Sequence, residues 1–164
     1  MNKEEFDKAY QRAKGQYVQA MDLMAKDAPF MENLPERINT LLAKIKSLIE
    51  DAAKSKTGYE LVGKIEELKD IVVCLAVLDK QVMGFFEETT EDWKHLSVLM
   101  KTYTEHSFPG ENLPKSKDGA TEWVTQLEET AAELLRTYTS LNKRIIPIRQ
   151  EFNSLMMATH PYLN

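Results

Sequence analysis

Apolar residues recur along most of the chain at alternating intervals of four and three positions, and strand-like alternation is nearly absent. This spacing is typical of amphipathic α-helices. The first run predicts a helix over residues 3–27, ending before Pro29 because proline disfavours helix in the residue that precedes it. Its apolar seam consists of Phe6, Tyr10, Ala13, Tyr17, Ala20 and Met24.

A second helix is predicted over residues 35–56. Asn33-Leu34-Pro35-Glu36 has the composition of a helix start, with an Asx cap, an early proline and a glutamate at the third position. The helix should stop near Thr57-Gly58, because glycine readily adopts the left-handed conformation that ends a helix. Its seam is Ile38, Leu41, Ile45, Leu48 and Ala52.

The third segment, residues 59–107, keeps one register over its whole length. We therefore favour a single long helix, because an unbroken register is what one continuous helix would show. The alternative is a break near residue 89, where Thr89-Thr90-Glu91-Asp92 resembles a helix N-terminus. The seam is Ile65, Leu68, Val72, Leu75, Asp79, Val82, Phe86, Thr89, Trp93, Leu96, Met100 and Tyr103.

A fourth helix is predicted over residues 120–158, after a loop at 108–119 that is rich in proline and glycine. Pro147 lies inside this helix and should kink it, because proline removes one backbone hydrogen bond. The register resumes in phase beyond it. The seam is Val124, Leu127, Ala131, Leu134, Tyr138, Leu141, Ile145, Ile148, Phe152 and Leu155.

These elements predict a single all-α domain over residues 1–164, an elongated antiparallel bundle of four to five long heptad-patterned helices. The first two helices are about half as long as the last two, so we expect them to flank only one end of the long pair. If the third segment is one continuous helix, the other end would expose a seam that two helices bury poorly. Either the helix folds back there to complete a compact bundle, or that end docks on another chain. We expect a protein partner or a second copy to cover it, at Trp93, Leu96, Met100, Trp123 and Leu127.

Composition narrows the classes of function. The net charge of −5 comes without a basic stripe, so we expect no nucleic-acid partner. The one cysteine, Cys74, excludes an internal disulfide and lies among apolar residues, which predicts a core side chain. The N-terminus lacks an apolar signal region, and no run approaches the ~20 residues that span a bilayer. We expect a soluble, cytoplasmic protein.

The sequence offers little for catalysis or metal binding. His95 and His106 are about 16 Å apart along a helix, too far to share a metal. Asp92 and His95 have the spacing of a di-iron motif, but no second such pair exists. Acidic doublets such as Glu66-Glu67 fall mainly at polar positions and predict a solvated face. We therefore expect no enzyme activity, no cofactor, no metal and no small-molecule substrate.

Residues 71–86 depart from the striped pattern, because the stretch is apolar around most of the helix. One interpretation is a central helix that is buried on every side. The other is a concealed segment that is released to a membrane or a partner. The residues concerned are Ile71, Val72, Val73, Leu75, Val77, Leu78, Phe85 and Phe86.

This apolar tract, the long heptad helices and the following Glu-Asp-Trp-Lys-His-Leu-Ser-Val-Leu-Met stretch together resemble the bacterial helical pore-forming toxins of the cytolysin A and tripartite haemolysin type. The resemblance is one of architecture and transfers no individual residue. It implies an elongated soluble bundle that hides an apolar head, and secretion without an N-terminal signal peptide.

The leading functional prediction is a non-enzymatic interaction or assembly subunit that acts through helix–helix association. The alternative is a component of a helical pore-forming toxin, and only this alternative requires a membrane.

Overall fold

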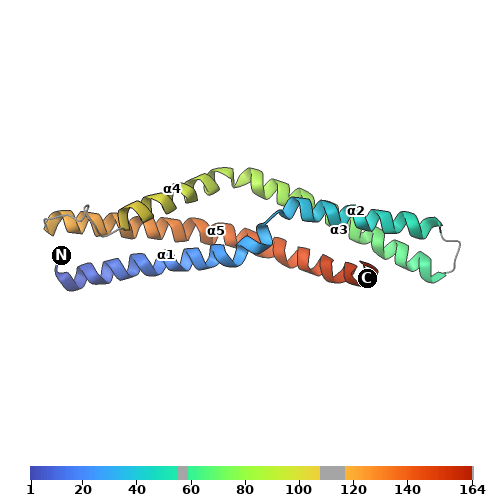
Figure 1. Ribbon diagram of the computed structural model, residues 1–164, viewed down its shortest axis with the longest axis horizontal. Helices are drawn as coiled ribbons and strands as arrows, with labels where there is room; N and C mark the ends of the chain where they lie inside the picture. The colour runs from blue at the N-terminus through green and yellow to red at the C-terminus, as the bar shows by residue number, and fades with distance from the viewer. Residues whose placement is uncertain (55–58, 108–116, 164) are drawn as a thin grey trace. The chain divides into compact units, whose positions relative to one another are not determined.

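The computed structural model describes residues 1–54, 59–107 and 117–163, which form five α-helices and no strand. The prediction of an all-α helical bundle is confirmed (Figure 1). The helices are α1 (Lys3–Met31), α2 (Leu34–Lys54), α3 (Tyr59–Glu88), α4 (Thr90–Ser107) and α5 (Lys117–Leu163).

Helix α1 continues beyond its predicted end and runs through Pro29 to Met31. The early stop was wrong because the preference against helix before proline is modest, and Phe30 packs in a core just beyond it. Asn33, with a left-handed φ of 52°, separates α1 from α2. The guanidinium of Arg37 donates hydrogen bonds to the carbonyl oxygens of Phe30, at 2.7 Å, and Glu32, at 3.4 Å, which satisfies the free end of α1.

Helix α2 begins at Leu34, one residue before the predicted start. Its seam is confirmed, with Ile38, Leu41 and Ile45 buried and Leu48 half-buried. The predicted stop near Thr57-Gly58 lies outside the described residues.

The interpretation of residues 59–107 as one continuous helix was wrong, since α3 ends at Glu88 and α4 begins at Thr90. The alternative, a break near residue 89, is what the structure shows. The buried Thr89 accepts hydrogen bonds at its carbonyl oxygen from the Trp93 amide and at its hydroxyl from the Trp93 indole, both 3.0 Å long. Glu91 and Asp92 lie in the first turn of α4, where their negative charges interact favourably with the positive end of the helix dipole.

Helix α3 also uses a different register from the predicted one. Ile71, Leu78 and Phe85 are buried, whereas the predicted seam residues Val72, Asp79 and Phe86 are only half-buried. The two stripes share Leu68, Leu75 and Val82, and the observed one leaves Asp79 half-buried, with its Oδ1 buried. Both stripes are largely apolar, so the spacing alone did not distinguish them.

Helix α5 begins at Lys117, so the last three residues of the predicted loop are helical; residues 108–116 lie outside the described part of the chain. The helix continues through Pro147 to Leu163, beyond the predicted end at 158. All ten predicted seam residues, from Val124 to Leu155, are buried. The kink at Pro147 stays a prediction.

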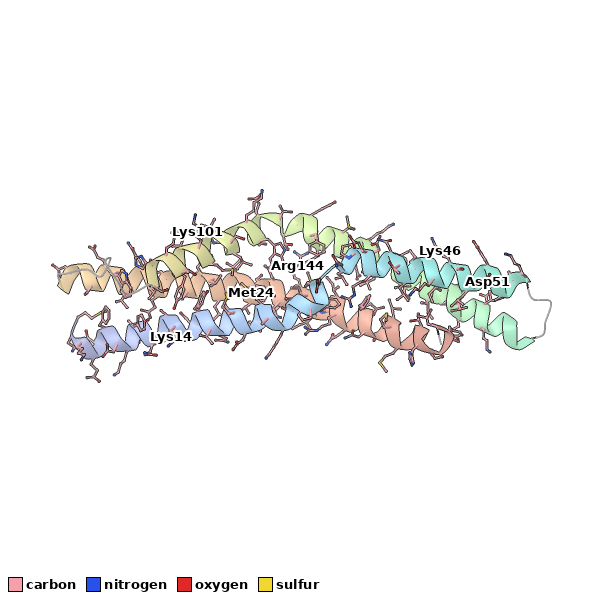
Figure 2. All side chains as sticks on the ribbon, viewed as in Figure 1. Lys14, Met24, Lys46, Asp51, Lys101 and Arg144 are labelled. Carbon is pink, nitrogen blue, oxygen red and sulfur yellow. The ribbon has the colours of Figure 1, made fainter. Side chains whose placement is uncertain are left out.

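The chain forms two compact units. The first contains residues 1–29 and 89–143, and its core joins α1, α4 and the first part of α5. The second contains residues 30–88 and 144–164, in which α2 and α3 lie side by side (Figure 1) and the last part of α5 supplies the third helix. Arg144 of α5, labelled in Figure 2, pairs with Glu88 and lies 5.3 Å from the ring centre of Phe85. That the whole chain is a single domain stays a prediction.

Candidate functional site

The residues predicted to form an exposed partner interface lie mostly in the core of the first unit. Leu96, Trp123 and Leu127 are 2%, 8% and 0% exposed, and Trp93 and Met100 are half-buried. The prediction of a bare two-helix seam was therefore wrong. It assumed that the first two helices flank the same end, whereas α1 packs in the first unit and α2 in the second.

An aromatic cluster around Trp123 shows how α1 closes this seam. The Trp123 ring stacks on Phe6 and Tyr10 of α1, with ring centres 6.0 and 6.2 Å apart, and on His106 of α4 at 5.4 Å. Nε2 of His106 lies 3.0 Å from the Trp123 carbonyl oxygen. Small residues at Ala9 and Ala13 let α1 approach closely enough to make these contacts. Trp123 is thus an internal packing residue.

Tyr17, Tyr103, Trp93 and Tyr138 also contribute ring contacts to this unit. Tyr17 of α1 stacks on Tyr103 of α4 with ring centres 4.0 Å apart. Burial raises the pKa of the Tyr103 hydroxyl above its ordinary value, and the neighbouring Tyr10 and Tyr17 raise it further. Trp93 meets Tyr138 edge-on at 6.2 Å.

A buried polar cluster, which was not predicted from the sequence, joins α1 to α5 in the same unit. The carboxylate of Asp27 is buried, and its Oδ2 accepts hydrogen bonds from the Tyr138 hydroxyl at 2.8 Å and from the Asn142 amide at 2.7 Å. The sequence contains a signal for the burial of Asp27, because this residue continues the four-and-three spacing of Ala20 and Met24. Such a satisfied polar group favours one register of two helices over others.

The candidates for metal or acid–base chemistry remain dispersed. His95 is exposed and its Nε2 lies 3.3 Å from Glu133 Oε1 across to α5. Over residues 1–54, 59–107 and 117–163, no three His, Cys, Asp or Glu side chains come close enough to hold a metal ion. The prediction that Cys74 is a core side chain was wrong, because its thiol is exposed.

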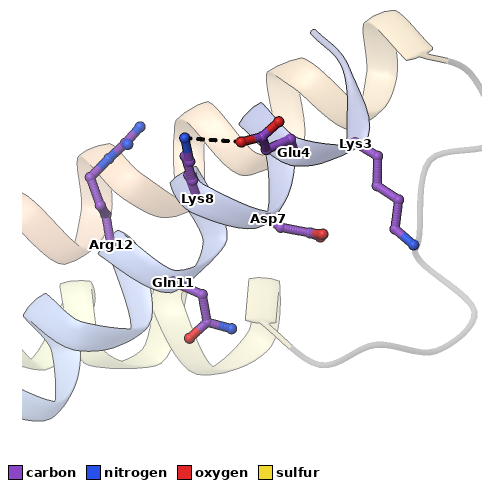
Figure 3. A pocket seen from close by; sticks show the side chains of 6 residues that line it. All are labelled: Lys3, Glu4, Asp7, Lys8, Gln11 and Arg12. Atoms are coloured by element: carbon purple, nitrogen blue, oxygen red, sulfur yellow. Dashed lines mark ion pairs between the residues drawn. The ribbon is translucent and has the colours of Figure 1, made fainter.

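A shallow pocket at the start of α1 brings together charged side chains without any arrangement typical of catalysis. The six residues that line it all come from this one helix (Figure 3). Lys8 pairs with Glu4 at 3.2 Å, and Arg12 pairs with Glu128 of α5 at 2.7 Å. These contacts pair two of the three cationic side chains that line the pocket. The lining residues are Lys3, Glu4, Asp7, Lys8, Gln11 and Arg12.

The apolar tract of α3 has two different faces. Ile71, Leu75, Leu78 and Phe85 are buried in the core of the second unit, while Val72 and Phe86 are half-buried. The side chains of Val73 and Val77, one helical turn apart, are 62% and 50% exposed. Neither sequence interpretation therefore describes the whole tract. It is not buried on every side, and part of it already lies at the surface.

We call the outward-facing row of α3 the outer stripe. It is a continuous four-and-three series with an apolar centre and charged residues on both sides of that centre. Beside it, a groove of about 400 Å³ is lined by Lys46, Ile49 and Glu50 of α2 and by Lys69, Val72 and Val73 of α3. Lys46 lies on the exposed side of α2 (Figure 2). The outer stripe consists of Glu66, Asp70, Val73, Val77, Lys80 and Gly84.

Comparisons with known proteins do not place the chain in a family. No family model matches it, and no solved structure matches it. It is 34% identical over 92 residues to the tRNA-2-methylthio-N(6)-dimethylallyladenosine synthase of Aquifex aeolicus (strain VF5). That match covers 55% of this chain but only 21% of the synthase, so the chain spans about a fifth of that relative's length. Among the described residues, no helix combines the length and apolar character needed to cross a membrane.

Proposed function

We propose that the protein is a non-enzymatic assembly subunit that associates with helices of another protein molecule, its own copy included, through the outer stripe of α3. The observation that carries the proposal is the exposure of Val73 and Val77 on a helix whose opposite face is core. Neighbouring apolar side chains at the surface are typical of an interaction site. Ile49 and Val72 extend the apolar surface into the adjoining groove.

The arrangement of charge around these valines supports helix association. Asp70 precedes the apolar pair in the stripe and Lys80 follows it, each at the adjacent position, and both are exposed. An apolar centre with charged flanks is the pattern by which one helix recognises another, because the apolar residues supply affinity and the charges fix partner and direction.

A pair of double variants tests the proposal. Val73→Glu with Val77→Glu places charge on the stripe, and Val18→Glu with Val98→Glu is the matched control on two valines of the first unit that are 46% and 60% exposed. The molecular mass in solution is followed by sedimentation over a wide concentration range. We expect the unmodified chain to rise above its monomer mass of 18.9 kDa, the stripe variant to stay at it, and the control to behave like the unmodified chain.

Helical content by circular dichroism should be the same for all three proteins, because the substituted side chains lie at the surface. A chain that remains monomeric at the highest concentration would overturn association between copies, and a control that loses association equally would overturn the outer stripe as the site of association.

The alternative function, a component of a helical pore-forming toxin, draws on the same two exposed valines, which would also suit a lipid surface. Flotation with phosphatidylcholine–phosphatidylglycerol vesicles separates the two functions. Vesicle binding that the stripe variant loses, without any rise in mass in the absence of lipid, favours the toxin component over the assembly subunit.

A further inference from the structure

We infer that the outer stripe of α3 binds a second copy of this chain, with the two α3 helices antiparallel about a two-fold axis at the level of Leu75. This inference rests on the proposed function, and it specifies the partner and the direction of packing.

The spacing of the outer stripe is the first reason. Its steps are four, three, four, three and four, so the series reads the same in both directions about the midpoint between Val73 and Val77. A second copy that runs the opposite way therefore matches the stripe position by position. Val73 faces the partner's Val77 and Val77 faces the partner's Val73, which brings all four exposed valines together at the centre.

Charge is the second reason. In this antiparallel arrangement Asp70 faces the partner's Lys80, and Lys80 faces the partner's Asp70. Neither side chain has an ion-pair partner among the described residues. They are ten positions apart, about 15 Å along the helix, so they cannot pair within one chain. A parallel arrangement would instead oppose aspartate to aspartate and lysine to lysine.

The ends of the stripe fit the same arrangement. Glu66 would face the partner's Gly84, a position with no side chain. A Cβ atom built on Gly84 meets nothing within 4 Å, so this side of α3 is open. The Glu66 carboxylate already lies 3.7 Å from the Lys69 ammonium in its own chain. No unpaired charge is therefore forced against an apolar surface.

The size of the contact sets its strength. The stripe extends for about 27 Å along the helix, which places the interface at the small end for protein pairs and predicts a weak, concentration-dependent dimer. Two chains that each carry a net charge of −5 also repel one another. The two cross-helix ion pairs offset part of that repulsion.

A charge-swap experiment tests the antiparallel direction. Asp70→Lys alone opposes lysine to lysine twice, and Lys80→Asp alone opposes aspartate to aspartate twice. Each single variant should dimerise roughly tenfold more weakly than the unmodified chain, because two surface ion pairs change from attraction to repulsion. An equimolar mixture of the two single variants should associate again, and so should the doubly substituted chain. Sedimentation at low salt, where surface charges are least screened, measures all four samples.

Cys74, the one cysteine of the chain, gives an independent measurement. It lies beside the stripe, and a two-fold axis places both copies of it on the same side of the helix pair, offset by about 3 Å along the helices. A bis-maleimide that spans the distance between packed helices, about 8–10 Å, should join two unmodified chains. The yield should fall in each single variant and recover in the mixture.

The results separate this inference from the proposed function. Rescue by the mixture and recovery of the cross-link support the antiparallel pair. Association that depends on Val73 and Val77 but ignores both charge swaps overturns the antiparallel arrangement and leaves the assembly function in place. Association that ignores the valines as well overturns both.

Discussion

The two units of the chain bury similar heptad seams in different ways. The core of the first unit combines alanines on α1 with large aromatic rings around Trp123, and the buried carboxylate of Asp27 joins α1 to α5. The core of the second unit is built mainly from leucine, isoleucine, valine and phenylalanine on α2, α3 and α5. Helix α3 there has more apolar residues than its core uses, and the excess lies outside, at Val73 and Val77. An apolar run therefore predicts an interaction surface only once the face that it buries in its own core is known.

The largest effect should separate the two faces of α3. Leu75→Glu places a charge in the core of the second unit, where Leu75 is fully buried, and should cost several kcal/mol, comparable to the whole stability of a small domain. Val73→Glu, two positions away but exposed, should change the free energy of unfolding by less than about 0.5 kcal/mol. Urea unfolding at low protein concentration, followed by circular dichroism, measures both. Equal effects would contradict the two-faced description of α3.

A second substitution tests whether Trp123 packs internally in the first unit. Trp123→Ala should cost about 3–5 kcal/mol, because it removes the ring that stacks on Phe6, Tyr10 and His106. Self-association, measured where the variant remains folded, should be unchanged. A variant of normal stability that loses association would return Trp123 to the role of partner anchor.

The buried polar cluster of the first unit should give a smaller loss. Asp27→Ala leaves the Tyr138 hydroxyl and the Asn142 amide without that acceptor and should cost about 2 kcal/mol. Asp27→Asn is the matched control, since an amide oxygen in the place of Oδ2 can still accept both hydrogen bonds. If both variants unfold at the same urea concentration as the unmodified chain, the cluster does not stabilise the unit.

The smallest effect is a dependence on alkaline pH. The pKa of Tyr103 is raised in the folded chain because burial disfavours the phenolate. A raised pKa means that the folded state holds this proton more tightly than the unfolded state. The resulting contribution to the free energy of unfolding is complete below about pH 10, and it is lost as pH rises through the pKa of Tyr103 in the folded chain. Urea unfolding at pH 9 and pH 11 should show a smaller decrease in stability for Tyr103→Phe than for the unmodified chain. If the free energy of unfolding decreases equally in both proteins, groups other than Tyr103 cause the loss of stability at alkaline pH.

The sequence predicted the fold class and the seams of α2 and α5, because in those helices a single stripe is apolar and the opposite face is polar. It did not predict the register of α3, where two overlapping stripes are apolar. The end of α1 was misplaced because the local preference around Pro29 is weaker than the packing of Phe30 in the core.

The candidate site was less predictable than the fold. Burial of Leu96, Trp123 and Leu127 depends on which unit α1 joins, and no local pattern specifies that. Exposure of Val73 and Cys74 likewise depends on how α3 turns towards α2 and α5. The break at Thr89 was visible in Thr-Thr-Glu-Asp, but a helix start can be signalled within a register that continues across it.

Helix α5 contributes residues 117–143 to one unit and residues 144–163 to the other, and it is one continuous helix. Extending an existing helix is far easier than nucleating a new one. When either unit is folded, it therefore holds a template from which the remainder of α5 can grow. Thermal unfolding of the chain should consequently be more cooperative than the unfolding of two independent units. A destabilising substitution in the core of one unit should also lower the unfolding temperature of the other.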